Sequence, residues 1–137
     1  MEGKIYAVID TNVIVSALIS KSLESNPLKV FRAIFQNRIV PLYNDEIMDE
    51  YRTVLSRPKF RLDKSMIETV LKAVAVDGLR MDRTPADDVD FPDLKDIVFY
   101  EVALSKEDSY LITGNIKHFP LEPFIVTPAE MVRILNL

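Results

Sequence analysis

Acidic side chains occupy the positions of this sequence that are best placed to do chemistry. Asp10 directly follows an apolar run that is typical of a buried strand. Glu46 and Glu50 are four residues apart, so they share one face if their segment is helical. Asp93 and Asp96 are three apart, with the same consequence. If these groups meet in space, the site is a cluster of carboxylates.

Residue counts exclude several other kinds of site. The chain has no cysteine, which excludes disulfides, thiolate nucleophiles and Cys-based zinc or iron–sulfur centres. It has one histidine, His118, so any site that needs two imidazoles is excluded as well. The three glycines cannot be arranged into either of the two common glycine-rich phosphate loops.

A carboxylate cluster restricts the chemistry. Two carboxylates about 4 Å apart repel by roughly 4 kcal/mol at an effective dielectric constant near 20. Three or more therefore remain ionised together only beside a cation, and oxygen ligands select hard ions such as Mg²⁺ or Mn²⁺. Waters on such an ion can attack a phosphodiester while the metal stabilises the leaving oxygen. Metal-assisted phosphodiester hydrolysis is the reaction class that suits this cluster best.

Short β-rich runs alternate with longer segments of helical period. We expect strands at residues 4–9, 39–43, 79–81, 110–113 and 124–126. We expect helices at residues 12–20, 44–57 and 94–105, and from residues 26, 63 and 128 onward. The alternation predicts an α/β fold: one domain over residues 1–137, a three-layer α/β/α sandwich with a central, mostly parallel sheet. Pro41 indicates that its strand lies at an edge or bends, whereas functional groups gather at the carboxyl ends of the strands.

Composition and charge indicate what kind of protein carries this site. The chain is 48% apolar and 28% charged, with a net charge of −4, so any basic surface must be local. No stretch is long enough to cross a membrane and no leader peptide is visible, so we expect a cytoplasmic protein.

A cluster of basic residues surrounds Phe60: Arg57, Lys59, Arg61 and Lys64. This group could hold a phosphate backbone and stack a base, or it could be a solvated turn.

Four motifs occur in an order and spacing that resemble the PIN-domain nucleases, over nearly the whole chain. They are Asp10-Thr11-Asn12, Glu50 with the following Tyr51, Leu55 and Arg57-Pro58-Lys59-Phe60, Asp96 before Phe99-Tyr100-Glu101, and Leu111-Ile112-Thr113-Gly114-Asn115 before His118-Phe119-Pro120. In particular, they look like the branch of the family that contains toxin components of toxin–antitoxin pairs.

The resemblance implies a ribonuclease that uses Mg²⁺ or Mn²⁺, that is often a homodimer, and that in many members is neutralised by a small antitoxin. By position, Asp10, Glu50 and Asp96 would be the metal-binding acids. The family's usual fourth acid is replaced here by Asn115, whose carbonyl oxygen could face a metal or orient a water with one negative charge fewer. Asp93 is the natural candidate to supply the missing charge.

Each acid also has an ordinary structural explanation. Asp10 and Asp93 could cap the helices that follow them. Asp96 could be a first-turn acid favoured by the helix dipole, and Glu50 could be an exposed surface residue. We favour a functional role for Asp10, Asp96 and Glu50, and helix capping for Asp93.

Other polar residues could support the acids. Glu101 lies in an apolar helix, so its carboxylate must be paired or face a cavity. Thr113 and Asn12 are candidate hydrogen-bond partners for the acids. His118 is the only candidate general base other than a carboxylate, although a lone histidine in a loop is more often structural.

Three functions compete. The leading one is a metal-dependent endoribonuclease-type hydrolase in which a metal-bound water attacks RNA. The alternative is a non-catalytic PIN-like module that binds RNA or a protein partner, with its site degraded at Asn115. A phosphotransfer enzyme with Asp10 as phosphate acceptor is disfavoured, because the haloacid-type pattern would need a second acid at Asn12.

Overall fold

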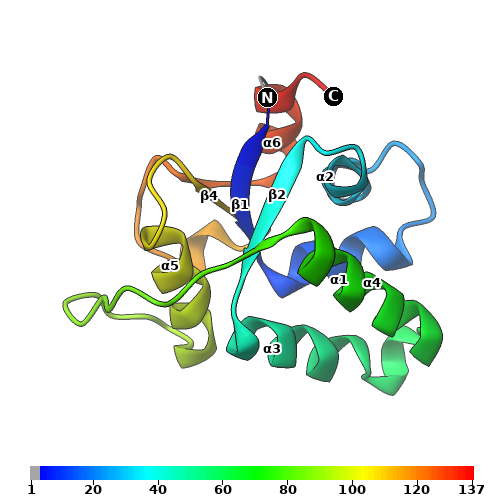
Figure 1. The fold of residues 1–137 in the computed structure, drawn as a ribbon, viewed down its shortest axis with the longest axis horizontal. Helices are drawn as coiled ribbons and strands as arrows, with labels where there is room; N and C mark the ends of the chain where they lie inside the picture. The colour runs from blue at the N-terminus through cyan, green and yellow to red at the C-terminus, as the bar shows by residue number, and fades with distance from the viewer. Residues whose placement is uncertain (1–3) are drawn as a thin grey trace.

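A computed structural model describes residues 4–137, which form a parallel sheet between helices (Figure 1). Its strands are β1 (Ile5–Ile9), β2 (Ile39–Tyr43), β3 (Leu79–Arg80), β4 (Tyr110–Ile112) and β5 (Ile125–Val126). Their order across the sheet is β3-β2-β1-β4-β5, and every neighbouring pair is parallel. The predicted α/β/α fold is therefore confirmed.

The helices cover both faces of the sheet. They are α1 (Thr11–Ile19), α2 (Asn26–Phe35), α3 (Asp45–Leu55), α4 (Lys64–Asp77), α5 (Ile97–Leu104) and α6 (Pro128–Leu135), with 3-10 turns η1 (Pro58–Phe60), η2 (Leu94–Asp96) and η3 (Ile116–His118). Figure 1 shows α5 on one side of the strands and α1, α2 and α4 on the other. Right-handed connections require this division, because the chain moves outward from β1 to β2 and β3 and then returns to β4. The strand order thus reverses between β1 and β4, at the lower end of the sheet in Figure 1.

Side-chain caps account for the starts of α2, α3 and α6. Asn44 caps α3, and Thr127 forms a capping box with Glu130 at the start of α6, both as predicted. At α2 the cap is Ser25, whose side chain accepts a backbone N–H of the first turn, and not Asn26 as the sequence suggested. Ser25 and Asn26 are adjacent and both are good capping residues, so the sequence alone does not decide which of them caps the helix.

Pro41 lies in an interior strand, so the predicted edge position is wrong. β2 pairs with β1 through residues 39–41 but with β3 only from Leu42 onward. Pro41 therefore precedes the β2–β3 pairing, where a missing N–H costs no ladder hydrogen bond.

Helix α5 is the most deeply buried helix segment near the site, as its apolar sequence predicted. Residues 98–103 are all buried, including Glu101. The preceding residues form η2 and not a continuous α-helix from residue 94. Within residues 4–137, no helix combines the length and apolar character needed to cross a bilayer.

Gly78, which ends α4, permits a close backbone approach that a side chain would block. A Cβ atom at this position would overlap the carbonyl oxygens of Val74 and Pro41, and backbone atoms cannot easily move aside. We expect Gly78→Ala to lower the free energy of unfolding by about 2 to 3 kcal/mol. Gly114→Ala is the matched control, because no atom of the described chain beyond the two neighbouring residues lies within 4 Å of its Cβ. Urea denaturation of both variants tests this, and equal midpoints would contradict it.

Candidate active site

Asp10 lies at the carboxyl end of β1, where the strand order reverses. Its backbone N–H donates to the carbonyl of Ile112 at 2.9 Å, and the Thr113 hydroxyl donates to Asp10 Oδ2 at 2.7 Å. Both side chains are buried, with Asp10 5% and Thr113 0% exposed. The Asp10 carboxylate makes no capping bond to α1, so capping does not explain it. Thr113 is confirmed as its hydrogen-bond partner.

Opposing effects set the pKa of the Asp10 carboxyl. Burial is the largest cause that raises its pKa, and the nearby Glu50 carboxylate raises it further. The hydrogen bond from Thr113 acts in the opposite direction, because it stabilises the charged form. Behind this site, the buried Tyr51 hydroxyl donates to the carbonyl of Ile9, the last residue of β1.

Asp96, at the end of η2, is the second perturbed acid. Burial is the main cause that raises its pKa to about 6, followed by the charges of Asp10 and Asp93. Asp96 Oδ2 is buried and has no hydrogen-bond partner among residues 4–137. The nearest basic nitrogen is His118 Nδ1 at 3.4 Å, a long contact from a half-exposed ring. The structure therefore brings Asp10 and Asp96 into electrostatic contact and leaves one oxygen of Asp96 unsatisfied.

The remaining predicted site residues surround this pair without joining it in one cluster. Glu50 is half-buried on α3. Asp93 is exposed and caps η2 by accepting the backbone N–H of Lys95 at 3.0 Å, as the capping alternative predicted. Asn115 is half-buried, and its backbone N–H donates to Thr113 Oγ1 at 3.0 Å. Among residues 4–137, no three acidic or histidine side chains form a group that could hold a metal ion.

The acid pair nevertheless fits a hard divalent cation. Magnesium in proteins is usually held by one or two carboxylates, and water and substrate phosphate complete its shell, so a cage of three acids is not required. The orphaned oxygen of Asp96 is a donor that such an ion would satisfy. A cation beside Asp10 and Asp96 would also remove the repulsion that raises the pKa of Asp96.

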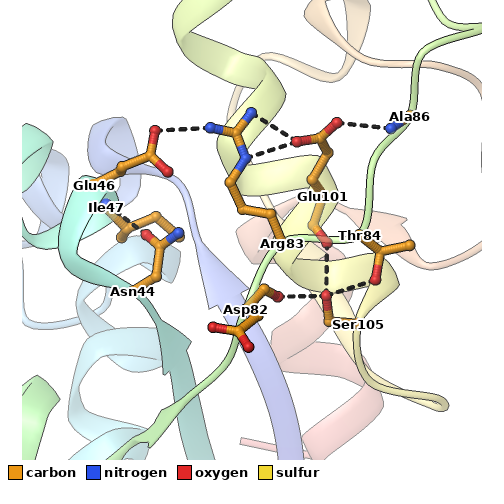
Figure 2. A network of polar contacts seen from close by, with 9 residues as sticks. All are labelled: Asn44, Glu46, Ile47, Asp82, Arg83, Thr84, Ala86, Glu101 and Ser105. Carbon is orange, nitrogen blue, oxygen red and sulfur yellow. Dashed lines mark hydrogen bonds and ion pairs between the residues drawn. The ribbon is translucent and has the colours of Figure 1, made fainter.

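A second group of charges is centred on Arg83, which the sequence did not single out, and connects Glu46 of α3 with Glu101 of α5 (Figure 2). Arg83 Nη1 contacts Glu46 Oε2 at 2.7 Å, and its Nη2 and Nε contact Glu101 Oε1 at 2.6 and 2.7 Å. The other oxygen of Glu101 accepts the backbone N–H of Ala86 at 2.7 Å. The predicted pairing of Glu101 is thus confirmed. The sequence feature that could have singled out Arg83 is that it is the only basic residue in the acidic stretch 82–93.

Further contacts attach the acidic stretch 82–93, which is the loop before η2, to helix α5. Ser105 Oγ donates to the carbonyl of Asp82 and contacts Thr84 Oγ1 at 2.8 Å. Farther along the loop, the Phe91 ring packs edge-on against Tyr100, with ring centroids 5.4 Å apart. The acidic stretch 82–93 is therefore packed onto α5. This packing positions η2, which follows the stretch, at the site.

Comparison with known proteins identifies the family. The sequence matches the PIN domain family over residues 6–117, which include every predicted site residue. The chain belongs to this family, whose members are generally nucleases. The curated proteins include no match to this sequence. The resemblance to PIN-domain nucleases is confirmed at the level of the family.

The raised pKa of Asp96 makes a prediction about stability. A carboxyl whose pKa is higher in the folded than in the unfolded protein stabilises the fold below its unfolded pKa, and this contribution is lost as pH rises through about 6. In EDTA, we expect Asp96→Asn to be more stable than the wild type by about 1 to 3 kcal/mol at pH 7.5. The difference should shrink towards pH 4, as measured by urea denaturation. Asp87→Asn, at an exposed loop position, is the control, and a gain that does not depend on pH would contradict the assignment.

The Arg83–Glu101 pair predicts non-additive changes in stability. Arg83→Met should destabilise the protein by about 2 kcal/mol, below the roughly 3 to 5 kcal/mol of a fully buried pair, because 34% of the Arg83 side chain is exposed. Adding Glu101→Gln should restore about 1 kcal/mol, since it removes the uncompensated charge and keeps an acceptor for Ala86. Arg80→Met, which breaks the exposed pair with Asp45, should destabilise the protein less than Arg83→Met does. Additive losses in the double variant would refute the pairing.

Proposed function

We propose that this protein is a metal-dependent endoribonuclease-type hydrolase that cleaves RNA phosphodiester bonds. The observation that carries the proposal is the acid pair Asp10–Asp96 at the point where the strand order reverses. In open parallel sheets this is where ligands bind. Burial raises the pKa of both carboxyls, and the charge of Asp10 raises that of Asp96 further. Raised pKa values of this kind are typical of catalytic or metal-binding carboxylates. Membership of a family of nucleases supports the same chemistry.

In the proposed mechanism Asp10 and Asp96 would hold Mg²⁺ or Mn²⁺, with the Glu50 carboxylate of α3 close enough to Asp10 to raise its pKa. A bound ion of this kind supplies an activated water and stabilises the leaving oxygen. Thr113 fixes the orientation of the Asp10 carboxylate through its 2.7 Å hydrogen bond. Asn115 contributes an amide in place of a fourth acid. Asp93, although it caps η2, adds negative charge that attracts a cation.

The resemblance to the toxin branch extends this proposal to partners and setting. We propose a cytoplasmic homodimer whose activity is neutralised by a small antitoxin protein. These partners rest on the four sequence motifs, whereas the acid pair supports the hydrolytic activity itself.

The activity is tested with purified protein and end-labelled single-stranded RNA in Mn²⁺, Mg²⁺ or EDTA. We expect cleavage only with a divalent cation. Asp10→Asn should reduce the rate by about 100-fold or more, which corresponds to roughly 2.7 kcal/mol in the activation barrier. Asp87→Asn, which changes the charge by the same amount at an exposed position, should keep the wild-type rate. Cleavage that persists in Asp10→Asn would show that Asp10 is not the catalytic acid.

Two observations favour a second candidate, a non-catalytic module that binds RNA or a protein partner. In the described part of the chain no three acids assemble into a metal-binding group, and position 115 carries an amide. This candidate predicts no cleavage and no shift of the melting temperature in Mn²⁺. If Asn115→Asp then gains both properties, the site has been degraded at that position.

A further inference from the structure

A cavity of about 380 Å³ opens beside the acid pair, and the proposed mechanism does not use it. Its polar lining comes from Asn12 and Ser16 of α1 and from Asn115, and its aromatic wall is Phe60 of η1. Gly114 and the first turns of α2 and α6 complete it. The volume lies at the lower end of the range of small-molecule binding pockets, roughly 300 to 1,000 Å³.

The cavity lies close to Asp10, because two of its lining residues are near Asp10 along the chain or through Thr113. Asn12 is two residues after Asp10, at the start of α1. Asn115 is two residues after Thr113, and the Thr113 hydroxyl both donates to Asp10 and accepts the Asn115 N–H. A nucleotide whose phosphate lies at the acids would therefore place its neighbouring group at the cavity.

The lining has the chemistry of a nucleobase site. The half-buried Phe60 ring offers a face for stacking. The amides of Asn12 and Asn115 each carry donors and an acceptor, which can pair with a base edge. Lys59 Nζ lies 5.1 Å from the centre of the Phe60 ring, so a positive charge for the phosphate backbone accompanies the aromatic surface. Arg61, the next residue after Phe60, adds to this charge.

We propose that this cavity binds one base of single-stranded RNA, adjacent to the phosphate that is cleaved. Phe60 stacks on the base, and Asn12 and Asn115 contact its edge. The proposal rests on the proposed function, because it takes the acid pair as the place of cleavage. A single strand is required, since bases in a duplex are already stacked and paired. An amide at position 115 suits this role, because it offers both donors and an acceptor to a base edge, whereas an ionised carboxylate offers acceptors alone.

Binding is measured by fluorescence anisotropy in EDTA, so that no cleavage occurs. The probes are a short fluorescein-labelled single-stranded RNA and a series of the same RNA with one abasic position each. We expect one abasic position to weaken wild-type binding by about 5- to 100-fold, since base stacking on an aromatic is worth roughly 1 to 3 kcal/mol. Phe60→Leu should lose a similar factor on the intact RNA and lose nothing further on that abasic probe.

Two further variants complete the design. Phe35→Leu changes an exposed aromatic at the end of α2, outside the cavity lining, and should bind both probes as the wild type does. Asn12→Ala alters an exposed lining residue and should weaken binding to the intact RNA several-fold even if Phe60→Leu folds poorly. Independent losses from Phe60→Leu and from the abasic position would overturn the proposal, as would no loss at any abasic position.

The outcomes separate this proposal from the proposed function. Coupled binding losses without metal-dependent cleavage would retain the base site and reject the nuclease. Cleavage that depends on Asp10 without coupling at Phe60 would retain the nuclease and reject the base site.

Discussion

The hydrogen bond between the Thr113 hydroxyl and the Asp10 carboxylate is the interaction on which the site depends. An ionised carboxylate at the end of a buried strand is costly unless it has partners. Here the partner is the residue that follows the adjacent strand β4, which the chain reaches only after crossing to the other face of the sheet. The topology therefore decides that Asp10 and Thr113 meet, although they are 103 positions apart.

Two acidic groups in this molecule differ in the partners available to balance their charge. Glu46 and Glu101 share the guanidinium of Arg83, a cation that belongs to the chain, and Glu101 also receives a backbone N–H. Asp10 and Asp96 have no comparable basic partner in the described chain, and their proximity raises the pKa of Asp96. The first group attaches a loop to the fold. In the second group, the negative charges of Asp10 and Asp96 are not balanced by a cation of the described chain, as the proposed binding of an external cation requires.

The fold was predictable from the sequence to the extent that its signals are local. Strand and helix positions follow from hydrophobic period and from caps such as Asn44 and Thr127, whose partners are three residues away. Asp10 could be singled out because it directly follows a buried strand. Arg83 could not be placed in the same way, because its partners are 18 and 37 positions distant and no periodic pattern links them. Pro41 misled because the short β3 begins to pair only after it.

The open space around Gly114 gives experimental access to the site. Apart from its two neighbours in the chain, no described residue has an atom within 4 Å of a Cβ built there, and Gly114 lines the cavity beside Asn115. The natural sequence contains no cysteine. A Gly114→Cys substitution would therefore create the single thiol of the molecule, and a fluorophore or spin label attached to it would report on the cavity with no background labelling elsewhere.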